Sequence, residues 1–150
     1  MRAAPRWFID NLARVHVTGD ETGGRSCLVE AEGRRGDMPP LHVHHRDDET
    51  FYVVDGTLTL IQPGSEVVLE AGSAFRAERG VPHVYRVESE TARWLAFCEP
   101  GGFDEFVLEV SEPAPAEQLP PAGRPQDPGT LAAAASKQGI ELLGPPGTLP

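Results

Sequence analysis

Four of the five histidines of this 150-residue chain lie in two short groups, where the sequence could support metal chemistry. The first group is the run His42-Val43-His44-His45, and the second is His83, which follows Val81-Pro82. Residues two apart in a β-strand face the same side, so we expect His42 and His44 to point inward together. Neutral imidazoles placed in this way form half of a metal site.

Two further side chains could complete such a site. Glu49 begins the next run of strand-forming residues and can supply a carboxylate, and His83 can come from a neighbouring strand of a barrel. Three imidazoles and one carboxylate suit Mn, Fe, Co, Ni, Cu or Zn, but not Ca or Mg. In an octahedral arrangement, four protein ligands leave about two adjacent positions open. That geometry suits a bidentate oxygen substrate, or one substrate oxygen together with dioxygen.

The spacing of these residues forms two motifs, at residues 36–56 and 72–87. The first runs Gly36-x5-His42-x-His44-x4-Glu49-x6-Gly56, and the second runs Gly72-x7-Gly80-x2-His83. This pattern resembles the two motifs of the cupin superfamily over roughly residues 30–100. The first motif is matched at every fixed position. In the second, Glu78 stands where the family usually has proline and Val87 where it usually has asparagine, and neither is a ligand position.

The resemblance implies a ligand set for one divalent transition-metal ion per chain, namely His42, His44, Glu49 and His83. His45 has the opposite parity from His44, so we expect it to face solvent or to lie behind the ligands. Asp47 and Asp48 are interpreted as a solvated loop at the mouth of the barrel. The alternative is that one of the two carboxylates orients a ligand histidine.

The segments that must position these side chains are typical of an all-β protein. Many short runs of strand-forming residues are separated by Gly, Pro and Asp, and no helical pattern alternates with them, which favours a sandwich or barrel. Asp55-Gly56 lies between two such runs and predicts a hairpin turn. The predicted strands are Arg14–Thr18, Ser26–Glu32, Leu41–His44, Thr50–Val54, Thr57–Gln62, Glu66–Glu70, Ala74–Ala77, His83–Val87 and Ala92–Cys98. With the resemblance, the prediction becomes a single-domain cupin-type jelly-roll β-barrel.

The composition changes near residue 113, because nine of the 15 prolines lie between Pro113 and Pro150. We therefore predict a barrel domain over residues 1–112 and a Pro-rich extended arm over residues 113–150. A short C-terminal helix is predicted at about residues 128–138, because Asp127 suits an N-cap, Pro128 the first helical position and Gly139 a stop. The apolar segment that follows the helix predicts that the arm docks on the barrel or on a second subunit.

Charge and cysteine content limit the classes of partner. The formal net charge is -10, which disfavours nucleic acid and anionic membranes as partners. No apolar stretch reaches the roughly 20 residues of a membrane helix, and the first residues lack the apolar core of a signal peptide. We expect a cytoplasmic protein in which Cys27 and Cys98 are buried thiols, with a single disulfide as the alternative. Arginine supplies 12 of the 13 basic residues, which fits a GC-rich bacterial genome.

The predicted substrate pocket is an apolar wall beside the metal ligands. Its candidate residues are Met38, Phe51, Phe75, Tyr85, Trp94 and Phe97, with plain core packing as the alternative for each. Phe51 and Tyr85 have the same strand parity as Glu49 and His83, respectively. Arg76, Arg79 and Arg86 could meet an anionic substrate, and the alternative is that they balance acidic surface residues.

The segments after the barrel, from Phe97 to Phe106 and from Gly139 to Pro146, resemble the small single-domain bacterial cupins related to quercetin dioxygenase. This similarity implies a metal-dependent dioxygenase for a flavonol-like hydroxylated aromatic or an enolisable dicarbonyl, with Glu49 taking a proton from the substrate. One alternative is a non-redox cyclase or isomerase of aromatic polyketide metabolism, and another is a ligand-binding cupin without turnover. The predicted partners are a small-molecule substrate, dioxygen and a second copy of the chain in a homodimer.

Overall fold

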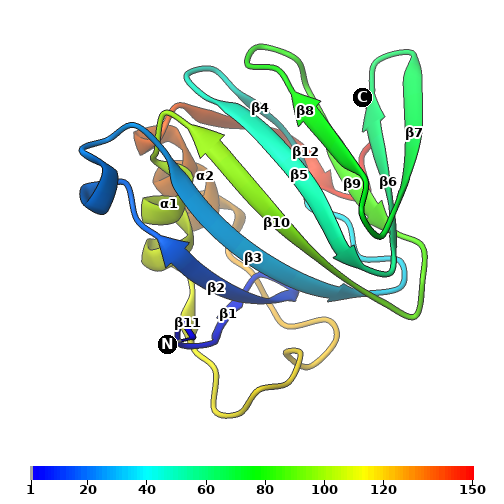
Figure 1. Ribbon diagram of the computed structural model, residues 1–150, viewed down its shortest axis with the longest axis horizontal. Coiled ribbons are helices and arrows are strands. Elements are labelled where there is room, and N and C mark those ends of the chain that lie inside the picture. Colours follow the sequence, from blue (N-terminus) through cyan, green and yellow to red (C-terminus); the bar gives the residue numbers. More distant parts are fainter. Residues whose placement is uncertain (1) are drawn as a thin grey trace.

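The computed structural model describes residues 2–150, which form strands, two α-helices and one short 3-10 helix (Figure 1). The helices are α1 (Phe103–Val110) and α2 (Pro128–Lys137), and the 3-10 turn is Asp20–Thr22. The strands are β1 (Arg6–Phe8), β2 (Asn11–Val17), β3 (Cys27–Arg34), β4 (Pro40–His44), β5 (Asp48–Asp55), β6 (Thr57–Gln62), β7 (Ser65–Glu70), β8 (Ala74–Ala77), β9 (Val84–Val87), β10 (Thr91–Glu99), β11 (Glu112–Pro113) and β12 (Ile140–Pro146).

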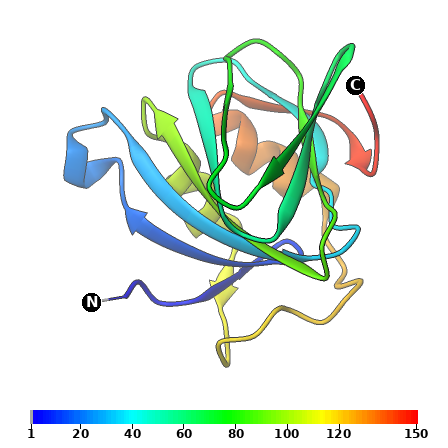
Figure 2. The same ribbon diagram turned by 45° about the vertical axis from the view of Figure 1, so that its right-hand side comes forward.

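The strands form two layers. One layer is a seven-stranded antiparallel sheet in the order β11-β1-β2-β3-β10-β5-β8. The facing layer contains the sheet β7-β6-β9 and the pair β12-β4, and a backbone bridge between His42 and His83 joins β4 to β9 (Figures 1 and 2). The fold is therefore the all-β jelly-roll barrel that the strand pattern and the family resemblance together predict.

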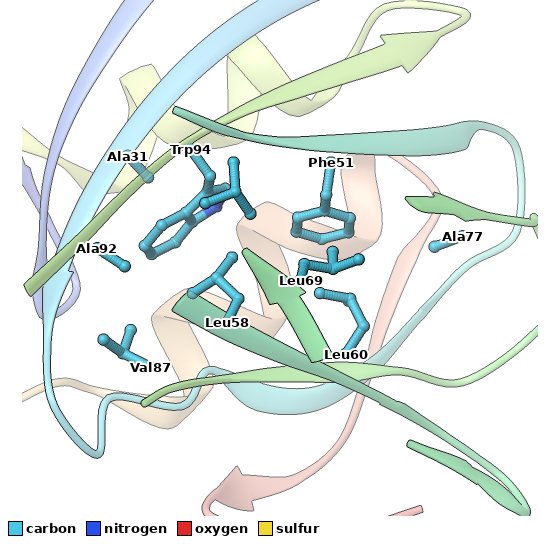
Figure 3. Close-up of a cluster of buried hydrophobic side chains, with 10 residues drawn as sticks. Ala31, Phe51, Leu58, Leu60, Leu69, Ala77, Val87, Ala92 and Trp94 are labelled. Atoms are coloured by element: carbon cyan, nitrogen blue, oxygen red, sulfur yellow. The ribbon is translucent and has the colours of Figure 1, made fainter. Parts of the chain in front are cut away.

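The main core lies between the two layers because alternate residues of each strand face inward. In β10, Ala92, Trp94, Ala96 and Cys98 are buried, whereas Phe97 is 36% exposed. Trp94 packs with Phe51 of β5 and with aliphatic side chains of β6, β7 and β9 (Figure 3). Burial of such side chains contributes about 1.5–3 kcal/mol each to folding, so this cluster holds the layers together.

The Asp55-Gly56 step is not a hairpin turn, which corrects the expectation from sequence. β5 pairs with β10 and β8, whereas β6 pairs with β7 and β9, so the chain crosses from one layer to the other at this step. Gly56 has φ +79°, and a Cβ there would lie 2.4 Å from the carbonyl oxygen of Thr91. An Asp-Gly pair permits a sharp change of direction whether or not the flanking strands pair with each other.

Two helices fill the end of the barrel away from the β6–β7 hairpin (Figure 1). The strand pattern did not predict α1, although Phe103, Phe106, Val107 and Val110 recur at helical spacing. Phe106 and Val107 are buried together with Phe8 of β1 and with small residues of α2. The helices thereby cover the end of the barrel opposite the β6–β7 hairpin.

The C-terminal segment packs on the barrel of its own chain. β12 pairs antiparallel with β4, with Ile140 opposite His44 and Leu142 opposite His42. The extended stretch between the helices is held by the Trp7 indole, which donates to the Gln118 carbonyl oxygen at 2.9 Å. Within residues 2–150, no helix is long and apolar enough to cross a membrane.

Candidate metal centre

The two sequence motifs meet at one buried point. One ligand atom from each of His42, His44, Glu49 and His83 lies within 4.8 Å of the others. β4 supplies two imidazoles on one face, β5 supplies the carboxylate, and His83 directly precedes β9. His44, Glu49 and His83 are only 2%, 4% and 1% exposed. The Glu49 Oε2 atom lies 3.1 Å from His44 Nε2 and 3.0 Å from His83 Nε2.

Backbone and carboxylate acceptors orient two of the imidazoles. His42 Nδ1 donates to the carbonyl oxygen of Pro40 at 2.7 Å, and His44 Nδ1 lies 3.0 Å from both carboxylate oxygens of Asp47. An imidazole that donates through Nδ1 can present the lone pair of Nε2 to a metal. In both histidines of β4, Nε2 rather than Nδ1 is therefore the atom that could coordinate a metal.

Asp47 does not lie in a solvated loop, as one reading of the sequence expected. Its side chain is buried, and its carboxylate contacts His44, so the alternative role of orienting a ligand histidine fits the structure. Asp48 is the solvated member of the pair, and hydrogen bonds from Arg79 with the charge of Arg76 lower its pKa to about 2. His45 is exposed, and its Nε2 atom lies 2.8 Å from Glu141 Oε2.

Burial and charge set the protonation of the cluster. Burial, together with the neighbouring imidazoles of His83 and His44, lowers the pKa of His42 to about 3. Burial also acts to lower the pKa of His44, but the carboxylates of Glu49 and Asp47 outweigh this effect and raise it to about 10. Burial raises the pKa of Glu49, but His44 and His83 reverse the shift and hold it well below its usual value. The carboxylate of Glu49 is thus both charged and buried at neutral pH.

The donor set fits a divalent transition metal on two observations. The Nε2 atoms of His44 and His83 converge on Glu49 Oε2 inside the buried cluster, at 3.1 and 3.0 Å. Glu49 is a buried carboxylate whose pKa is held well below its usual value, so it carries a charge that a divalent cation would balance. Three imidazole nitrogens and a carboxylate oxygen are donors typical of transition metals.

A largely apolar cavity opens beside the cluster. His42, His44 and Glu49 line one part of it. Apolar side chains from the seven-stranded sheet, the helices and β12 form most of the wall, and they include Val29, Phe51, Trp94, Ala96, Phe103, Phe106, Leu131, Ile140 and Leu142. An oxygen-bearing aromatic ligand could place its oxygens at the ligand cluster and its rings on this wall.

Four of the six predicted pocket residues line this cavity: Met38, Phe51, Tyr85 and Trp94. The other two do not. Phe97 lies on the outer face of β10, opposite in parity to Trp94, because strand side chains alternate. Phe75 of β8 is opposite Phe51 in the sheet and packs against the main core instead.

Sequence reasoning missed the contribution of the helices and of the turn before β2. Phe103 of α1 lies 6.0 Å from the His44 ring, measured between centroids, and Asn11 also lines the cavity. The helical spacing around Phe103 could have predicted α1. Asn11 carries no such signal, because its place depends on how distant strands pack.

Arg76, Arg79 and Arg86 all contact acidic side chains. The Nη2 atoms of Arg76 and Arg79 lie 2.9 and 3.2 Å from Asp48 Oδ2. Arg86 Nε lies 2.6 Å from Glu88 Oε1. These contacts favour charge balance over binding of an anionic substrate.

Comparison with known proteins gives one family and one curated relative. The family model described as "Cupin domain" matches residues 32–98. Quercetin 2,3-dioxygenase of Bacillus subtilis (strain 168) is 30% identical over 104 residues, which is 69% of this chain and 31% of that protein. The chain therefore spans about a third of the length of this relative.

Solved structures share the fold at lower identity. KdgF from Halomonas sp. has a TM-score of 0.57 and 21% identity over 64% of this chain and 85% of its own. The polyketide cyclase RemF from Streptomyces resistomycificus has a TM-score of 0.55 and 21% identity over 81% of this chain and 77% of its own. A predicted oxalate decarboxylase from Thermotoga maritima has a TM-score of 0.60 and 16% identity over 65% of this chain and 93% of its own.

Proposed function

This chain belongs to the cupin superfamily, and we propose that it is a metal-dependent dioxygenase of a flavonol-like hydroxylated aromatic or an enolisable dicarbonyl. One observation carries the proposal: three imidazoles and a buried carboxylate converge beside an apolar cavity. The similarity to the Bacillus quercetin 2,3-dioxygenase supports it. Because the fold hosts many reactions, the choice rests on the site and this relative.

In this proposal, His42, His44, Glu49 and His83 hold one divalent transition-metal ion. Such an ion lowers the pKa of a substrate hydroxyl and, when redox-active, permits reaction of the substrate with dioxygen. The apolar wall positions the rings of the substrate and excludes water from the reacting end. In this proposal the Glu49 carboxylate accepts the proton of the substrate hydroxyl, because it lies in the cluster and also lines the cavity.

Oxygen consumption tests this function. The protein, reconstituted in turn with Fe, Mn, Co, Ni and Cu, is incubated with quercetin or acetylacetone in an oxygen-electrode cell. We expect uptake with at least one metal, and a loss of about 10²–10⁴-fold in Glu49→Gln, the range typical of a lost general base. Glu141→Gln, an exposed glutamate that contacts His45, is the matched control and keeps full activity. Full turnover by Glu49→Gln would contradict the assigned role.

A non-redox cyclase or isomerase is the second candidate, because the same donor set also suits zinc as a Lewis acid. Turnover under argon with the zinc-loaded protein would favour it over the dioxygenase. Binding of quercetin without conversion, with or without oxygen, would favour a ligand-binding cupin.

The proposal includes a cytoplasmic homodimer. Cys27 and Cys98 are buried free thiols opposite each other in β3 and β10, which supports a reducing compartment. Tyr52 and Phe97 are 45% and 36% exposed on the outer face of the seven-stranded sheet, where a second copy could cover them. Light scattering should give about twice the chain mass of 16.2 kDa, and a mass of one chain would contradict the dimer.

A further inference from the structure

The cavity is lined by a second group of polar side chains besides the ligand cluster. Asn11, Asp37 and Tyr85 all line it, and Asn11 is only 5% exposed. The Tyr85 hydroxyl donates to Asn11 Oδ1 at 2.8 Å. Tyr85 lies two residues after His83, which places it about 7 Å further along the chain in extended conformation. The ring of Phe51 is near both side chains, 5.8 Å from the His83 ring and 6.4 Å from the Tyr85 ring, measured between centroids.

Two backbone features make room for this polar group. A Cβ at Gly33 would lie 3.0 Å from both Asn11 Nδ2 and Asp37 Oδ2, so the absence of a side chain at Gly33 lets these two groups approach β3. Ile9, in the turn between β1 and β2, has φ +54° and also lines the cavity. A β-branched residue seldom adopts this conformation, and such strain gathers at positions that clamp ligands.

The hydrogen-bonding capacity of the pair indicates what it can bind. Because the Tyr85 proton is directed to Asn11, the phenolic oxygen can still accept a hydrogen bond, and the Asn11 amide nitrogen can donate one. A hydroxyl group satisfies both partners at once. The carboxylates of Asp10 and Asp37 also line this part of the cavity and disfavour an anionic group there.

The wall between the two polar parts is aromatic. The rings of Tyr85 and Trp94 lie 4.7 Å apart between centroids, and Phe51 and Trp94 both line the cavity. A flat ring system can stack on or edge against these side chains. A small dicarbonyl would reach the ligand cluster. It would leave the remaining acceptor site of the Tyr85 oxygen and the amide donor of Asn11 without a ligand partner.

We propose that Asn11 and Tyr85 bind a neutral hydroxyl at the end of the substrate opposite its metal-binding oxygens. The site thereby selects an extended hydroxylated aromatic over a small dicarbonyl or a carboxylate. This inference rests on the proposed function for the part of the substrate that reacts. Tyr85 and Asn11 act here as specificity-determining residues.

Calorimetric titration under argon tests the inference. The ligands are 3-hydroxyflavone, which has only the metal-binding oxygens and the ring oxygen, and its 4′-hydroxy and 7-hydroxy derivatives. We expect one of the two derivatives to bind the unaltered protein about tenfold more tightly than 3-hydroxyflavone, the effect of one additional hydrogen bond. Tyr85→Phe should bind that derivative and 3-hydroxyflavone equally, while its affinity for 3-hydroxyflavone stays within about twofold of the original.

Tyr52→Phe is the matched control, because Tyr52 is exposed on the outer face of β5, and it should keep the preference. Asn11→Leu keeps a side chain of similar size and should also lose the preference, so the test does not depend on one variant folding. A preference that survives in both Tyr85→Phe and Asn11→Leu would overturn the inference, as would failure of the unaltered protein to bind any of the three flavonols. Because binding is measured without oxygen, a preference without later oxygen uptake would overturn the proposed function and leave the inference standing.

Discussion

At the scale of single residues, His44 determines how the site exchanges protons for a metal ion. The carboxylates of Glu49 and Asp47 raise its pKa to about 10, so His44 is protonated at neutral pH before a metal binds. A metal ligand must offer a free lone pair, so His44 has to lose its proton on binding. His42, with a pKa of about 3, is already neutral and releases none.

We therefore predict that binding of one Co²⁺ or Zn²⁺ ion at pH 7–8 releases about one proton. Calorimetry in buffers of different ionisation enthalpy measures this number. The apparent affinity of the protein for the metal ion should rise about tenfold per pH unit over this range. Below the His44 pKa, the fraction of His44 that is deprotonated and able to bind metal rises about tenfold with each pH unit. Asp47→Asn should release less than one proton, and Asp48→Asn is the control. No proton release by the unaltered protein would contradict this picture of His44.

The clustering of the four candidate ligands could be predicted at this scale because their spacing resembles the two motifs of the cupin superfamily. Alternation within β4 placed His42 and His44 on one face, and the two motifs brought Glu49 and His83 to them. The sequence did not decide whether Asp47 faces solvent or orients a ligand histidine, because its position depends on the conformation of the loop after β4. Whether the cluster holds a metal remains a prediction.

At the scale of elements, β12 couples the C-terminal segment to the site. Ile140 is buried opposite His44 in the β12–β4 pair and also lines the cavity. Ile140→Ala should lower the free energy of unfolding by about 2–5 kcal/mol, the usual cost of truncating a buried aliphatic side chain. Denaturant unfolding measures this change. Leu143→Ala, at an exposed position of the same strand, should change it by about 0.5 kcal/mol or less, and equal effects would contradict the docking of β12.

The sequence predicted strands better than connections. The predicted ranges Thr57–Gln62 and Ala74–Ala77 coincide with β6 and β8, because turn-forming residues stand close to the ends of these strands. The layer change at Asp55-Gly56 could not be read, because local turn chemistry does not say which strands pair. Phe97 is predicted in the pocket although its strand parity is opposite to that of Trp94, and the alternation in β10 corrects this prediction.

At the scale of the whole molecule, the ligand cluster joins both layers. β5 belongs to the seven-stranded sheet, whereas β4 and the start of β9 belong to the facing layer, so one ion would link the two. A ligand that binds only the folded chain stabilises it, by about 2.7 kcal/mol at a hundred times its Kd. For a chain of this size, removal of the ion by a chelator should lower Tm by about 5–10 °C. Scanning calorimetry measures the shift, and an unchanged Tm would contradict a structural link through the ion.

The division of the chain at residue 112 also belongs to this scale, and it remains a proposal. α2 and β12 lie beyond that boundary, yet Leu131, Ile140 and Leu142 line the cavity. The composition change at Pro113 therefore marks a change in local structure, while the residues that follow it help to enclose the site. Proline content alone could not predict this, because packing of the arm depends on a few apolar side chains spaced along it.

The most direct measurement is the metal content of the tag-free protein by elemental mass spectrometry. The unaltered chain should hold about one transition-metal ion per chain after reconstitution and gel filtration. His83→Ala should retain less than about a tenth of that amount, because it removes a buried ligand, whereas His45→Ala, at an exposed histidine beside the cluster, should retain all of it. Absence of metal from the unaltered protein, or equal retention by the two variants, would contradict a metal site formed by His42, His44, Glu49 and His83.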